Sequence, residues 1–167
     1  MGEFVRSPEP ADADERGIVL GWLAFHRDAL QVKCQGVPDE QLVERAAAPS
    51  KLSLLGLVRH MAEMEHVYGN WSLGPKTPLA WVWGSYDDDA EPDFDCTVAD
   101  VDASLRAWRE QMARTDEAIA AHPGLDERGE GNGRSVRWNL AKLVGEYARH
   151  NGHADIIRER IDGQTGE

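Results

Sequence analysis

Helical periodicity runs through nearly all of this sequence and limits its fold more than any other feature. Apolar side chains recur every three or four residues in four segments, which we expect to span 15–35, 53–73, 97–122 and 135–163. No segment keeps the alternation of apolar and polar residues that a half-buried strand requires. The sequence therefore predicts an all-α four-helix bundle.

The ends of these segments carry local stop and start signals. Serine and threonine side chains can accept hydrogen bonds from free backbone amides at a helix start, and glycine can end a helix in a left-handed conformation. The residues that we expect in these roles are Ser50 or Ser53 for the second helix, Thr97 with Asp100 for the third, and Ser135 and Gly163 for the fourth.

Residues 1–14 are acidic, contain proline and lack periodicity, so we expect a mobile N-terminal arm before a bundle domain over 15–163. The long loop at 75–95 has an aromatic half and an acidic half, and loops of this length are often functional. Its aromatic residues could cover a cleft or seal one end of the core; they are Trp81, Trp83 and Tyr86. Residues 87–89, all aspartate, lack the spacing of a calcium loop and are interpreted as a solvated run.

Composition excludes several classes of partner. Thirty acidic and 18 basic side chains give a net charge of −12, which disfavours nucleic acid and anionic membrane surfaces. No stretch approaches the roughly 18 apolar residues of a membrane span, and the N-terminus lacks the apolar core of a signal peptide. The two cysteines, Cys34 and Cys96, fit no metal-binding spacing. We expect a cytoplasmic protein.

The last helical segment carries three metal-capable side chains on one stripe. Glu146 and His150 lie about 40° apart around a helix, and His153 lies within about 20° of Glu146 on the other side. This stripe borders the apolar face that should look inward. Two imidazoles and a carboxylate beside a core must be hydrogen-bonded or bound to something.

The second segment supplies a fourth such side chain, His60. On a wheel of 100° per residue it shares the apolar face, whereas His66 lies on the opposite side, which we interpret as the outer one. The residues grouped with His60 are Met61, Met64, Val67, Tyr68 and Trp71, and those grouped with His66 are Leu55, Arg59 and Glu63.

His60, Glu146 and His150 together predict a metal site with at least one open position, as in catalytic rather than structural zinc sites. Zinc is the metal that we expect, and the same donors suit nickel and iron. A net charge near +1 would deprotonate a bound water or thiol. The alternative is a buried hydrogen-bond network without metal.

Three further residues are candidates to orient these ligands or to bind a substrate: His153 and Asn139 on the same stripe, and His26 in the apolar sector of the first helix. No serine lies in a nucleophile elbow, and neither cysteine has a base beside it in sequence. The sequence therefore identifies no catalytic side chain.

Three blocks of the sequence resemble signature regions of the DinB-like superfamily: PSKLSLLGLVRHMAEMEHVYGNW, DFDCTVADVDASLRAWREQMA and SVRWNLAKLVGEYARHNGHADIIRERIDG. They are most similar to an actinobacterial branch related to mycothiol-dependent maleylpyruvate isomerase and to the bacillithiol and mycothiol S-transferases. The similarity extends from the first helix to the end of the fourth. The resemblance implies an up-down-down-up bundle, a divalent metal in the core and a homodimer.

The resemblance also assigns residues and an activity. The superfamily's histidine on the second helix matches His60, and its pair on the fourth helix matches Glu146 and His150; His153 stands where many relatives carry glutamine. A low-molecular-weight thiol such as mycothiol would attack a small electrophile, giving S-transfer or isomerisation. The alternative is a non-catalytic metal-binding or stress-response bundle.

Overall fold

The computed structural model describes residues 6–85 and 91–165. Within them, helices are the only regular secondary structure, apart from one isolated bridge between Arg128 and Ser135. The elements are α1 (Glu15–Cys34), α2 (Asp39–Leu42), α3 (Leu54–Met64), the π-helix η1 (Glu65–Trp71), the 3-10 helix η2 (Val98–Asp100), α4 (Val101–Ala120) and α5 (Val136–Asp162).

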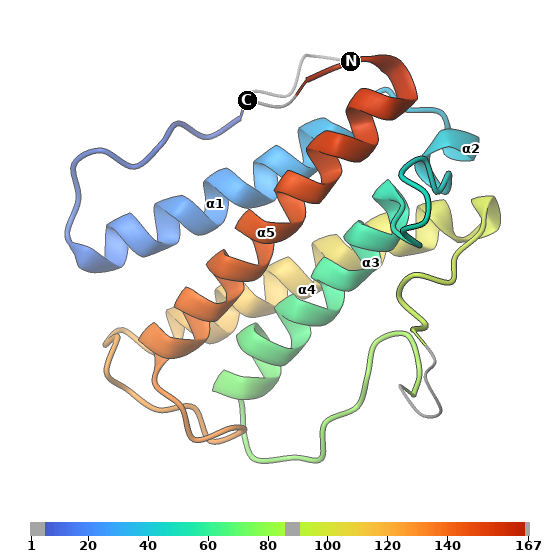
Figure 1. Ribbon diagram of the computed structural model, residues 1–167. Coiled ribbons are helices and arrows are strands. Elements are labelled where there is room, and N and C mark those ends of the chain that lie inside the picture. Colours follow the sequence, from blue (N-terminus) through green and yellow to red (C-terminus); the bar gives the residue numbers. More distant parts are fainter. Residues whose placement is uncertain (1–5, 86–90, 166–167) are drawn as a thin grey trace.

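The four long helices form the predicted up-down-down-up bundle. In Figure 1, α1 and α5 run in one direction, and α3 and α4 run in the other. A long connection separates the end of η1 from the start of α4, and α3 and α4 are parallel. Helix α5 packs against both α1 and α3. The all-α class and the topology are therefore confirmed.

Side-chain caps explain where the helices begin. Ser53, rather than Ser50, accepts a hydrogen bond from the backbone N–H of Gly56 and starts α3. The other predicted signals are also present: the capping box of Thr97 and Asp100, the Ser135 cap, and Gly163 with a φ of 78° after α5. The ends of the helices thus follow from local sequence.

Helix α3 is buried on both sides, so the expectation of an outer face was wrong. Leu55 and Glu63 are 0% exposed, and Arg59 is 8% exposed. The aromatic loop covers this face: the indole N–H of Trp83 donates to the carbonyl of Arg59 over 2.8 Å, and the N–H of Val82 donates to the Glu63 carboxylate. This part of the loop therefore packs over α3 and shields it from solvent.

The two tryptophans of the loop differ in their surroundings. Trp83 stacks on the Arg59 guanidinium at 4.0 Å, whereas Trp81 is 41% exposed. Tyr86 and the aspartates at 87–89 lie outside the described residues. The structure therefore places Trp83 directly on α3.

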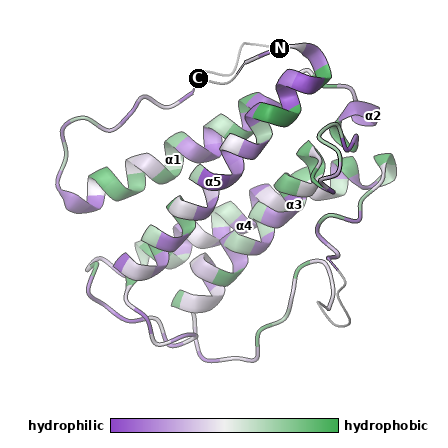
Figure 2. Cartoon of the chain, in the orientation of Figure 1, coloured by the Kyte–Doolittle hydropathy of each residue, from purple (hydrophilic) through white to green (hydrophobic). Residues whose placement is uncertain are grey.

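Helix α5 combines polar and apolar residues along its whole length (Figure 2). Several of its polar side chains are nevertheless buried: Asn139, Glu146, His150, Asn151 and Arg158. No helix in the described ranges is long and apolar enough to cross a membrane. Burial of so many polar groups requires partners for them inside the bundle.

Helix α5 also contributes Tyr147 to a separate buried polar group, the Glu65 network, which we define as Glu65, Arg27, Tyr147, Trp108 and Thr115. Two guanidinium N–H groups of Arg27 donate to the Glu65 carboxylate at 2.7 and 2.8 Å, and the Tyr147 hydroxyl donates to it at 2.7 Å. Trp108 donates to the Tyr147 oxygen, and Thr115 to the Glu65 carbonyl. Burial raises the pKa of Tyr147 well above its usual value, so the hydroxyl keeps its proton.

The described part of the N-terminal arm lies along α1. The N–H of Ser7 donates to the Asp28 carboxylate over 2.8 Å, and the Arg6 guanidinium lies 4.5 Å from the centre of the Phe25 ring. The mobility of residues 1–14 stays a prediction.

Candidate metal centre

The structure brings His60, Glu146 and His150 together between α3 and α5, and we call these three residues the His–Glu cluster. One ligand atom of each lies within 4.8 Å of the other two. The rings of His60 and His150 have centroids 4.5 Å apart, and Nε2 of His150 is 3.6 Å from Oε2 of Glu146. Residues far apart in the sequence thus present three donors to one point.

The geometry and chemistry of the cluster fit a divalent cation. Ligand atoms around tetrahedral zinc, with bonds of about 2.0–2.1 Å, lie roughly 3.3 Å apart, close to the spacing within the Glu146–His150 pair. The three side chains are 17%, 8% and 11% exposed in chain order. Across the described ranges, no other group of three or more His, Cys, Asp or Glu side chains meets the same spacing.

The protonation states are also those that a metal needs. Burial favours the neutral form of Glu146, but the Lys142 ammonium at 2.7 Å, with Arg149 and His150, outweighs it and lowers the Glu146 pKa. Burial, followed by the nearby His60 and His153, lowers the pKa of His150 to about 4. At neutral pH the cluster therefore offers an ionised carboxylate and an unprotonated imidazole.

The loop before η2 supplies two contacts to His60 that sequence reasoning missed. The Nδ1 atom of His60 lies 2.8 Å from Oδ2 of Asp93, which is 1% exposed, and the Phe94 ring stacks on the imidazole at 5.5 Å. Asp93 follows His60 by 33 residues in an aperiodic loop, so no spacing in the sequence related the two.

His153 lies beside the cluster. Its Nδ1 is 3.3 Å from Nδ1 of His150, on the side of that ring away from Glu146. The spacing of Lys142 and Glu146 also indicates an ion pair, because a lysine four residues before a glutamate on a helix can reach its carboxylate.

The other two candidate residues are bonded elsewhere. Asn139 accepts a hydrogen bond from the Asn132 side chain and donates to the Ser135 carbonyl, at the start of α5. His26 stacks on Trp22, and its carbonyl accepts from the Asn151 side chain. Neither shows a contact with the three cluster residues.

Comparison with known proteins gives one match. The sequence profile of the mycothiol-S-transferase family matches residues 18–163, which include the His–Glu cluster and most of every long helix. No curated protein and no solved structure matches the chain. The match covers well over half of the sequence and agrees with the resemblance to the DinB-like superfamily. The chain therefore belongs to the mycothiol-S-transferase family, a DinB-like family.

Proposed function

We propose that this protein holds a divalent cation with His60, Glu146 and His150 and uses mycothiol, or a similar low-molecular-weight thiol, to act on a small electrophile. S-transfer and isomerisation are the two reactions that this chemistry covers. The observation that carries the proposal is the convergence of three donor atoms within 4.8 Å in a chain of the mycothiol-S-transferase family.

A divalent cation bound by these donors would lower the pKa of a thiol that reaches it. The chain's own residues prepare the site for that role. Lys142 and Arg149 keep Glu146 ionised, while burial keeps the His150 ring neutral. Zinc is our first choice because imidazole and carboxylate donors in an open three-ligand site are typical of catalytic zinc.

The cellular setting belongs to the same proposal. We place the protein in the cytosol, where low-molecular-weight thiols are kept reduced, and both Cys34 and Cys96 are free thiols. The net charge of −12 supports a small-molecule substrate over nucleic acid. The homodimer implied by the superfamily remains part of the proposal.

Elemental analysis by plasma mass spectrometry tests the metal site. We expect about one equivalent of zinc in untagged wild-type protein and little in a His60→Ala, His150→Ala double variant, since one remaining ligand binds weakly. A His66→Ala, His122→Ala variant removes the same number of histidines away from the cluster and should keep its metal. No zinc in the wild type after reloading would reject the site.

Calorimetric titration with mycothiol tests the thiol separately. Zinc-loaded wild type should release heat on binding, and the double variant should not. A loaded protein that binds no thiol would leave a non-catalytic metal-binding bundle as the better description.

A further inference from the structure

We propose that Asp93 is a positioning residue: it fixes the His60 ring with Nε2 directed to the His–Glu cluster and so strengthens cation binding there. The proposal rests on the proposed function, because it requires a cation at the cluster. It concerns a residue outside the three donors, on a different segment of the chain.

The hydrogen bond between the two side chains sets the tautomer of the ring. The Asp93 carboxylate can only accept, so the 2.8 Å contact places the proton of His60 on Nδ1. The lone pair of the neutral ring then lies on Nε2. A carboxylate acceptor behind an imidazole ligand also makes that imidazole more basic, which favours metal binding.

The burial of the Asp93 carboxylate is only partly compensated inside the described fold, since His60 contacts one of its two oxygens. The Asp93 side chain is 2% exposed, and its Oδ1 atom has no hydrogen-bond partner among the described residues. Burying a carboxylate with an unpartnered oxygen is unfavourable. A cation bound on the far side of the His60 ring would add positive charge near this carboxylate.

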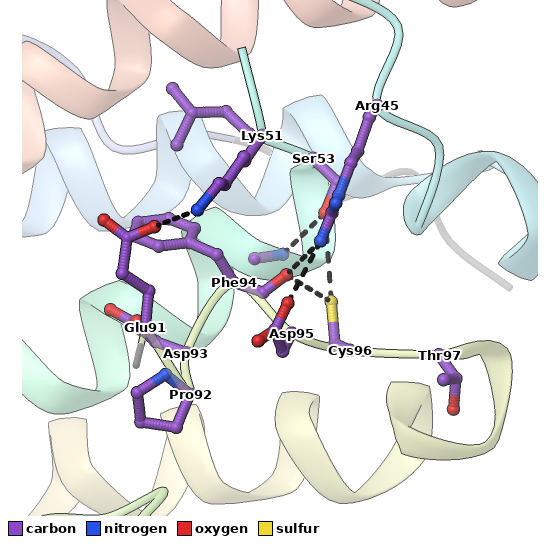
Figure 3. A network of polar contacts seen from close by, with 12 residues as sticks. Arg45, Lys51, Ser53, Glu91, Pro92, Asp93, Phe94, Asp95, Cys96 and Thr97 are labelled. Carbon is purple, nitrogen blue, oxygen red and sulfur yellow. Dashed lines mark hydrogen bonds and ion pairs between the residues drawn. The ribbon is translucent and has the colours of Figure 1, made fainter. Parts of the chain in front are cut away.

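Asp93 lies in residues 91–96, which we call the strap, and contacts on both sides of it fix the strap to the bundle. The Arg59 guanidinium donates to the carbonyls of Pro92 at 2.7 Å and Asp93 at 3.0 Å. Figure 3 shows the outer anchors of the strap, Lys51 to Glu91 at one end and Arg45 to Phe94 and Asp95 at the other. The carboxylate is thus fixed from both sides along the chain.

The other imidazole of the cluster is arranged in a parallel way. Nδ1 of His150 faces His153 at 3.3 Å, while its Nε2 lies on the Glu146 side. Both rings therefore have a partner at Nδ1, which leaves Nε2 as the ring nitrogen available to a cation. Because a charged acceptor forms the stronger hydrogen bond, Asp93 should contribute more than His153.

Zinc affinity, measured by competition with a chromophoric chelator, tests the proposal. We expect Asp93→Ala to weaken zinc binding by about 10- to 100-fold, and Asp93→Asn to fall between it and the wild type, because the amide oxygen still accepts. Asp95→Asn is the matched control on the same strap, with a side chain 75% exposed, and should stay within about twofold.

Two outcomes would overturn the proposal. Affinities of both Asp93 variants within about twofold of wild type would show that the carboxylate does not support the ligand, while leaving the metal site intact. A wild type that binds no zinc would reject the proposed function and this inference together, so the two failures are distinguishable.

Two further readouts separate positioning from a merely structural role. A residue that only holds the fold would, when changed, lower the melting temperature of metal-free protein, whereas Asp93→Asn should leave it unchanged or raise it. In zinc-loaded wild type, nitrogen NMR should show His60 protonated at Nδ1 and bound through Nε2. Binding through Nδ1 would contradict the proposal without any variant.

Discussion

Two of the buried polar groups in the described bundle, the Glu65 network and the His–Glu cluster, place their carboxylates in opposite surroundings. In the Glu65 network the carboxylate is 0% exposed and is neutralised by Arg27 and bonded by Tyr147. In the His–Glu cluster, Glu146 faces two imidazoles, and its cations, Lys142 and Arg149, are 38% and 62% exposed. The two groups are adjacent, since Glu146 and Tyr147 are consecutive on α5.

The comparison separates a closed polar group from an open one. No buried polar side-chain atom of the described Glu65 network lacks a hydrogen-bond partner. Beside the cluster, by contrast, one oxygen of Asp93 has none. A closed network has no free donor or acceptor for a ligand, so its role is to hold η1, α1 and α5 together. An open one can accept a cation.

Removing Arg27 should give the largest loss of stability. Arg27→Ala leaves the Glu65 carboxylate buried without its counter-ion, and we expect the free energy of unfolding to fall by about 3–5 kcal/mol. Urea denaturation of metal-free protein measures it. Arg137→Ala removes a half-buried arginine whose two partners, Glu15 and Asp126, are exposed, and should lower stability by no more than about 1 kcal/mol. Equal losses of unfolding free energy in the two variants would contradict the distinction between a buried ion pair and one on the surface.

Acid should destabilise the cluster in metal-free protein. The pKa of His150 is about 4 in the fold and about 6.5 in the unfolded chain, so the unfolded state binds the extra proton. Stability is therefore complete above about pH 6.5 and falls by up to about 3 kcal/mol as the pH drops toward 4.

Urea unfolding at several pH values, with and without His150→Gln, isolates this contribution. The depressed pKa of Glu146 acts in the same direction but at lower pH, and it is present in both proteins. Parallel stability curves for the two proteins would show that His150 titrates normally and that the cluster is not a desolvated site.

The smallest loss of stability is expected for Tyr147→Phe, which tests whether the Glu65 network is separate from the His–Glu cluster. Tyr147→Phe removes the hydroxyl that joins Trp108 to Glu65, and we expect a loss of about 1–2 kcal/mol in stability. Zinc affinity, measured by the same chelator competition, should stay within about twofold. A large loss of affinity would mean that the Glu65 network is part of the metal centre.

Local signals explain what could be predicted from the sequence. Ser53 and Ser135 mark helix starts by hydrogen bonds that reach only three residues along the chain. The one-turn spacing of Glu146 and His150 fixes their common face. The pairing of these two with His60 followed from bundle geometry and from the family resemblance, since no spacing in one segment contains it.

The remaining features depend on contacts between segments or on irregular backbone. The bonds of Arg27 to Glu65 and of His60 to Asp93 join residues 38 and 33 positions apart, with no repeat to reveal them. The π-helix also made the prediction from a regular helical wheel wrong after Met64. Its wider turn changes the angle between successive side chains, so different residues face the core. Glu65 and Gly69 are buried there, while the predicted Val67, Tyr68 and Trp71 are only half-buried.

Arg59 and His60 are consecutive on α3, and both bind Asp93, one through its carbonyl and the other through its carboxylate. One turn of α3 therefore holds Asp93 by both its backbone and its side chain. The orientation of the His60 ring is set by this turn and the strap, whereas the distance of 4.5 Å between the His60 and His150 rings is set by the packing of α3 against α5. The direction and the spacing of the candidate ligands thus depend on different contacts.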